Sequence, residues 1–160
     1  MKHVQQTFKQ RPNVTIRRRR GAVLLEAAIT LPVLLFVVFG LLDLGMAVLR
    51  QNSLAEAARR GARAAIIHGD SHETKQTVWG SGTYTGTAAD LTPQAEAVRP
   101  ALVLMPPADV TLKMEWLDGK SWPGQRVRVT ASYSNKPIFP FLIPAGLMSL
   151  HAVSTMRIAH

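Results

Sequence analysis

An apolar run from Ala22 to Leu42 constrains this chain more than any other feature. Among its 21 residues only Glu26 is ionisable, and Thr30 is the only other side chain with a strong polar group. A helix rises about 1.5 Å per residue, so the run is about 30 Å long, which matches the hydrocarbon thickness of a bilayer. The run is apolar on every helical face, whereas a surface helix of a soluble protein is apolar on one stripe. We therefore predict one transmembrane helix over residues 22–42.

The positive charge of the chain is concentrated before this run. There are 19 lysines and arginines against 10 acidic residues, which gives a formal net charge of +9. Residues 1–20 hold seven of the basic side chains and no acid, so the rest of the chain carries only +2. A nucleic-acid-binding protein spreads its basic residues over a folded face and interleaves base-stacking aromatics. We therefore expect a basic leader over residues 1–21 and no nucleic-acid partner.

Four consecutive arginines set the predicted orientation in the lipid bilayer. Arg17, Arg18, Arg19 and Arg20 lie directly before the apolar run. Arginines also follow the run, but fewer of them lie within 20 positions, so the positive-inside rule favours a cytoplasmic N-terminus and an extracytoplasmic C-terminal domain. A cleaved secretory signal is disfavoured because the run is too long and no A-x-A cleavage box follows it.

The carboxylate of Glu26 lies inside the predicted span, where a lone ionised group is costly and normally has a partner. Two interpretations are open. If the chain is cut after Gly21, Ala22 gains a charged α-amine that can pair with Glu26 of a neighbouring subunit, strongly so in a low dielectric. If the chain is not cut, Glu26 reaches back to the cytoplasmic head groups and favours the N-terminal end of the helix.

Helical character continues beyond the span through residues 43–67, which are rich in good helix formers. Pro32 lies inside the predicted helix and should kink it, because proline removes one backbone hydrogen bond. Small residues recur every four positions at Ala57, Gly61 and Ala65. This stripe either packs on the sheet of the chain's own domain or receives a helix of another subunit.

Residues 68–160 predict a small extracytoplasmic α+β domain. Residues 71–92 are rich in Gly, Ser and Thr and predict a loop, and residues 93–105 predict a short helix interrupted at Pro100. Alternating apolar and polar residues over 110–116, 126–133 and 150–158 predict a three-stranded antiparallel sheet. The connection 136–146 is unusually apolar for a loop, and it packs under the sheet, touches the membrane or contacts a neighbouring subunit.

Motifs for catalysis or cofactor binding are missing from the sequence. It contains no P-loop, no G-x-G-x-x-G, no G-x-S-x-G and no H-E-x-x-H. The only ligand-like cluster is His68, Asp70, His72 and Glu73, and Gly69 opposes the helix that would place both histidines on one face. We expect no catalytic residue, no cofactor and no metal site, so the chain is not predicted to be an enzyme.

The region around the apolar run resembles a known family. The motifs that carry the resemblance are, in order, Arg20-Gly21-Ala22, Leu25-Glu26-Ala27, Leu31-Pro32, Gly40-Leu41-Leu42-Asp43-Leu44-Gly45 and the alanine-rich Ala57-Ala58-Arg59-Arg60-Gly61-Ala62-Arg63. The junction is similar to the class III signal sequence of type IV prepilins. The longer stretch, about residues 20–65, resembles the TadE family, pseudopilins of the tight-adherence (Flp pilus) machinery. One departure is Glu26-Ala27, where the family often has Glu-Phe.

The resemblance implies a function and a set of partners. Gly21 would be the last leader residue, and a prepilin peptidase would cut between Gly21 and Ala22. The product would be a minor, non-catalytic subunit in the bacterial inner membrane, with a pilin-like fold and a periplasmic C-terminal domain. It would act with other pilin-like subunits and Tad inner-membrane proteins in assembling Flp/Tad pili or the linked secretion machinery, either within the fibre or as an assembly factor. The alternative is an unprocessed single-pass anchor that carries an extracytoplasmic binding module.

Overall fold

The computed structural model describes residues 15–68, 79, 82–139 and 148–158. By its internal contacts the chain divides into two compact units, residues 1–39 and residues 40–160. Parts of the predicted leader, of the 71–92 loop and of the 136–146 connection lie outside the described residues. Asp70, His72 and Glu73 of the ligand-like cluster lie outside them too.

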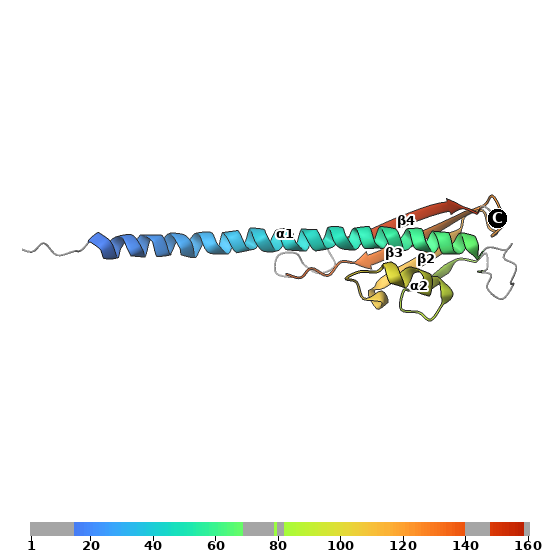
Figure 1. Cartoon of the computed structure of the whole chain (residues 1–160), viewed down its shortest axis with the longest axis horizontal. Helices are drawn as coiled ribbons and strands as arrows, with labels where there is room; N and C mark the ends of the chain where they lie inside the picture. The colour runs from blue at the N-terminus through green and yellow to red at the C-terminus, as the bar shows by residue number, and fades with distance from the viewer. Residues whose placement is uncertain (1–14, 69–78, 80–81, 140–147, 159–160) are drawn as a thin grey trace, which may run out of the picture. The chain divides into compact units, whose positions relative to one another are not determined.

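The helix α1 spans Thr15–Ile67 and contains 53 residues (Figure 1). It confirms the helix predicted from Ala22 to Ile67 and begins seven residues earlier, so the four arginines are helical as well. Pro32 lies inside α1. Two residues before this proline, the Thr30 hydroxyl donates a hydrogen bond of 2.9 Å to the carbonyl oxygen of Glu26, which satisfies the only hydroxyl of the apolar run. The kink at Pro32 stays a prediction.

The remaining elements follow α1 in the second unit. They are β1 (Tyr84–Thr87), α2 (Pro93–Val98), the 3-10 turns η2 (Arg99–Ala101) and η3 (Pro107–Asp109), β2 (Val110–Trp116), β3 (Arg126–Ser134) and β4 (Ser149–Arg157). The helix predicted over residues 93–105 is shorter than expected, because α2 ends at Val98 and Pro100 lies in η2.

The sheet has four antiparallel strands in the order β1-β2-β3-β4, so the prediction of three strands was wrong by one. The three predicted strands are confirmed as β2, β3 and β4 with the expected alternation of buried and exposed residues. Their register aligns the buried residues Leu112, Ala131 and Ala152 on one face. The strand that was missed, β1, pairs with β2 through Tyr84 and Met114.

The sequence of β1 explains why it was missed. The strand has only four residues, Tyr84 is its only large side chain, and Gly86 interrupts it. What fixes the strand is the turn that follows, where the Asp90 carboxylate accepts hydrogen bonds from the Thr87 amide (2.9 Å) and the Thr87 hydroxyl (2.7 Å). These bonds hold the pKa of Asp90 below its usual value. A Cβ at position 86 would collide with the Asp90 carboxylate, so any larger residue there would displace that carboxylate.

The second half of α1 packs on one face of the sheet through the small-residue stripe. Ala57, Gly61 and Ala65 are buried in one core with the inward residues of β2 and β3. A Cβ at Gly61 would lie 3.0 Å from Val98 Cγ2 and 3.1 Å from Val129 Cγ1, so the glycine lets helix and sheet approach closely. The stripe therefore serves the chain's own domain and is not available to a helix of another subunit.

Candidate functional site

The residues of the predicted cleavage junction all lie on the N-terminal part of α1. Gly21, Ala22 and Glu26 are exposed in the described structure. Glu26 follows Gly21 by five residues, which is about 7.5 Å along the helix axis. The side chains of residues 17–20 lie outside the described part of the chain, so their role in topology stays a prediction.

Gly21 has no packing role within the described residues. A Cβ built at this position meets no atom within 4 Å, in contrast to Gly61, where a Cβ meets three side chains. A glycine inside a helix lowers its stability by about 1 kcal/mol relative to alanine. Packing within the described residues therefore does not require a glycine at position 21.

Glu26 has no side-chain partner within the part of the chain that the structure describes. Its backbone carbonyl accepts the Thr30 hydroxyl, but no hydrogen bond or ion pair involves its carboxylate. The neighbouring large side chains from Val23 to Val38 are all exposed. In the described residues, one helix is long and apolar enough to cross a membrane. None of the most apolar stretch of this helix is buried inside the structure. A carboxylate in such surroundings is available to a cationic partner from another chain.

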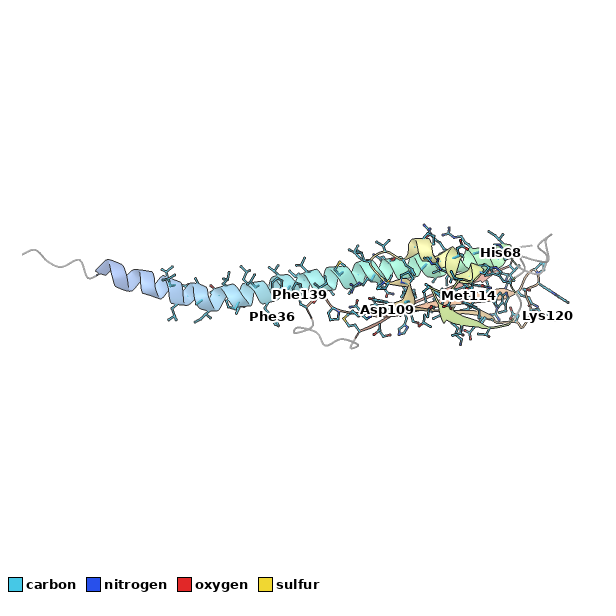
Figure 2. The ribbon with its side chains drawn as sticks, turned by 90° about the horizontal axis from the view of Figure 1, so that it is seen from below. Phe36, His68, Asp109, Met114, Lys120 and Phe139 are labelled. Carbon is cyan, nitrogen blue, oxygen red and sulfur yellow. The ribbon has the colours of Figure 1, made fainter. Side chains whose placement is uncertain are left out.

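A second cluster lies where α1 meets the segment after β3, and it begins with Asp43. This side chain is 5% exposed. Its Oδ1 accepts a hydrogen bond of 2.7 Å from the Ile138 amide, and its Oδ2 accepts one of 3.2 Å from the Phe139 amide. Figure 2 shows Phe139 beside α1. The carboxylate thus holds the segment after β3 against the helix.

Arg50 lies two turns further along the same face of α1 and is 9% exposed. Its Nη1 donates hydrogen bonds of 2.7 Å to Asn135 Oδ1 and to the Lys136 carbonyl. Its Nε donates to the Leu104 carbonyl at 3.3 Å, and its guanidinium lies 5.8 Å from the centre of the Tyr133 ring. Three separate segments therefore meet at one buried cation.

The bond from Arg50 also holds a strained residue. Leu104 has φ of 60°, in the left-handed region that non-glycine residues seldom adopt. Such a conformation persists only where the surroundings determine it. The guanidinium contact to the Leu104 carbonyl supplies one such restraint.

We call Asp43, Arg50 and the segment Asn135–Phe139 the clasp. An ion pair strengthens it, since Lys136 Nζ lies 2.7 Å from Asp109 Oδ2 and this contact raises the pKa of Lys136. The backbone N–H of Asn135 also donates a hydrogen bond of 2.9 Å to the Met148 carbonyl. The clasp was not predicted from the sequence. Its only sequence signal is that Asp43 and Arg50 are seven residues apart, in phase with the buried residues further along α1.

His68 is the one described member of the ligand-like cluster. Its Nδ1 lies 2.9 Å from the Ala64 carbonyl, and its ring stacks on Trp79 with centroids 4.8 Å apart. The Trp79 amide donates to the His68 carbonyl at 2.9 Å. His68 is therefore part of the packing at the end of α1.

The comparison with protein families matches the same part of the chain. Residues 21–63 match the family described as TadE-like protein. This stretch is TadE-like. It contains Gly21, Ala22, Glu26 and Pro32, both helical residues of the clasp and most of the small-residue stripe, and it ends before the sheet. The resemblance stated from the sequence is confirmed, and together with the apolar helix it supports a membrane protein related to the Tad pilus. No curated protein and no solved structure matches the chain.

The clasp predicts a specific loss of stability. Replacing Asp43 by alanine removes the acceptor of two amides, and unsatisfied buried donors destabilise by about 1–3 kcal/mol. Asp43→Asn is the matched control, because its single amide oxygen can still accept a hydrogen bond, and we expect a smaller loss. Denaturant unfolding of the full chain in detergent micelles, followed by tryptophan fluorescence, measures both. An Asp43→Ala protein as stable as the wild type would show that the clasp does not hold the segment.

Proposed function

We propose that this chain is a non-catalytic minor pilin-like subunit for assembly of Flp/Tad pili or the linked secretion machinery, processed by a prepilin peptidase. The observation that supports it most is the TadE-like stretch, in which Gly21, Ala22 and Glu26 lie at the N-terminal end of an exposed, apolar length of helix. In this proposal the protein crosses the bacterial inner membrane once, with the four arginines in the cytoplasm and the sheet in the periplasm.

Processing between Gly21 and Ala22 accounts for a glycine that packing does not need. A Cβ at Gly21 meets no described atom, so a larger side chain there would leave the fold intact. A peptidase that admits only a small residue before the cut would supply the missing reason. Glycine also weakens the helix locally, which favours the opening of the backbone that cleavage requires.

Cleavage would create the cationic partner that Glu26 lacks. The new α-amine of Ala22 carries a positive charge at neutral pH, and a carboxylate from an adjacent subunit at the inner edge of the membrane would attract it more strongly than in water. The pair would align neighbouring helices side by side. Other pilin-like subunits and Tad inner-membrane assembly proteins are the partners that this arrangement requires.

The fold agrees with a pilin-like role in its general plan. A long N-terminal helix contributes its exposed first half to a membrane and its small-residue second half to a sheet. The described residues contain no group of three or more potential metal ligands, and the clasp uses its charges for structure. The support for the proposed assembly role is the long helix with its exposed apolar first half and its packed second half.

The processing claim predicts a defined mass. In cells that carry a prepilin peptidase, intact-mass spectrometry should find residues 22–160, and Gly21→Leu should leave the full-length chain. Gly45→Leu is the matched control, because a Cβ at Gly45 also meets no atom within 4 Å, and that variant should still be cut. Retention of the leader by the wild-type chain in the presence of the peptidase would favour the unprocessed membrane-anchored binding module.

If Glu26 acts by pairing with a neighbouring subunit, replacing it should impair incorporation into the pilus machinery without impairing insertion into the membrane. Glu26→Ala should insert into the membrane at least as well as the wild type, because a charge leaves the bilayer. It should fail to join the pilus machinery, while Glu26→Asp, which keeps the charge, should retain part of that ability. Membrane fractionation and co-purification with the assembly complex measure the two properties. Normal incorporation of Glu26→Ala would remove the pairing role.

A further inference from the structure

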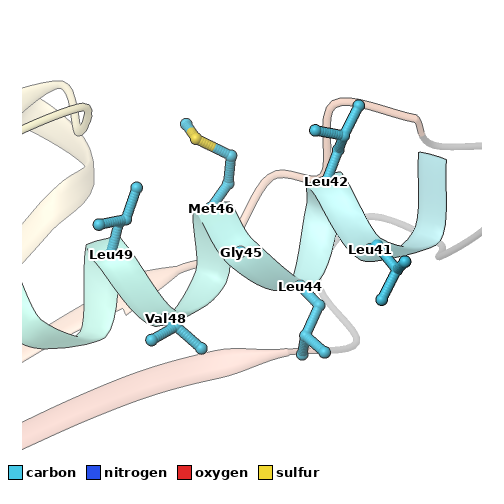
Figure 3. A pocket seen from close by; sticks show the side chains of 7 residues that line it. All are labelled: Leu41, Leu42, Leu44, Gly45, Met46, Val48 and Leu49. Atoms are coloured by element: carbon cyan, nitrogen blue, oxygen red, sulfur yellow. The ribbon is translucent and has the colours of Figure 1, made fainter. Parts of the chain in front are cut away.

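The exposed apolar surface of α1 does not end at Leu42, where the predicted span ends. Leu44, Val48 and Leu49 are 56%, 52% and 55% exposed. Figure 3 shows two rows of side chains here: Leu41, Leu44 and Val48 project from one flank of the helix, and Leu42, Met46 and Leu49 from the other.

The third face of this part of α1 carries the charges, and it is turned toward the domain. Asp43, Ala47 and Arg50 are all buried. Asp43 is the only ionisable residue between Ala27 and Leu49. Because its carboxylate is turned inward and accepts hydrogen bonds from the amides of the clasp, the outward surface of residues 40–49 presents no charge. Polar exposure begins with the half-buried Gln51 and the exposed Asn52. A charged group of Glu56, Arg59, Arg60 and Arg63 follows.

A second segment adds to the same surface. Ile138 is 49% exposed, and its amide is the one that donates to Asp43 Oδ1. The clasp therefore fixes an apolar side chain of the outer domain at the level of Asp43. We call this surface the apolar collar; it comprises Leu41, Leu42, Leu44, Val48, Leu49 and Ile138.

We propose that membrane lipid covers the apolar collar, so that the membrane–water boundary lies between Leu49 and Asn52. The collar continues the apolar run of the predicted span without an intervening exposed charge. From Ala22 to Leu49 there are 28 residues, or about 42 Å of helix, which fits the full bilayer thickness with its interfacial layers. This inference rests on the membrane anchoring of the proposed function.

Lipid on the collar explains the geometry of Asp43. A carboxylate at this depth cannot be left without partners, and the two amides of the clasp supply them from the same chain. With lipid on the collar, no linker separates the membrane from the domain. The segment that follows β3 then rests in the outer leaflet at Ile138.

Single cysteines test the boundary, and the chain contains none of its own. The variants are Leu44→Cys and Val48→Cys in the collar, with Leu34→Cys as the control within the span and Asn52→Cys as the control in water. Each purified full-length variant is placed in liposomes at low protein density and treated with a membrane-impermeant maleimide, before and after detergent. Relative to Asn52→Cys, we expect the two collar variants to lose labelling until detergent is added. A fluorophore attached at Val48→Cys in detergent, before reconstitution, should be quenched by brominated lipids.

The outcomes are distinct. Labelling of both collar variants to the same extent as Asn52→Cys, with Leu34→Cys protected, overturns the lipid-covered collar and leaves the membrane anchor in place. Labelling of Leu34→Cys as well overturns the anchor itself. Protection of the collar without quenching by brominated lipid means that a second copy of the chain covers it, which also overturns the proposal.

Discussion

The hydrogen bonds from the Ile138 and Phe139 amides to the Asp43 carboxylate are the contacts on which the rest of the structure depends. They turn the only charge in a long apolar stretch of helix toward the protein. Arg50 repeats this arrangement two turns later with Asn135 and Lys136. As a result one helix serves two environments: its first half faces outward with apolar side chains, and its second half faces a sheet.

The second half of the helix is built for close approach to the sheet. After Leu54 the buried residues of α1 are alanine or glycine, and at Gly61 the space is filled by Val98 and Val129 from the other elements. A domain this small has a limited core of its own, so the length of helix packed on it contributes much of its buried surface. The sheet and residues 40–67 of the helix therefore belong to one compact unit, and the TadE-like stretch alone would lack its packing partner.

Periodicity predicted most of this fold. The strands β2, β3 and β4 were visible because each alternates buried and exposed residues. The helix from Ala22 to Ile67 was visible because a long apolar run is followed by good helix formers. β1 was missed because Gly86 and three polar or small neighbours leave no apolar alternation, and pairing with β2 places it. The clasp was missed because it joins residues about 90 positions apart through backbone amides, which carry no sequence signal. The junction residues came from the family resemblance, and their roles rest on partners outside the chain.

The inward orientation of Asp43 joins the structural and functional proposals, since it leaves the helix uncharged where lipid or another subunit would meet it. Amide hydrogen exchange of the full chain in lipid nanodiscs tests this orientation most directly, at Ile138 and Phe139. Both amides should exchange as slowly as those in the interior of β3, because a buried carboxylate accepts them. Exchange of these two amides at the rate of an unstructured chain would contradict it.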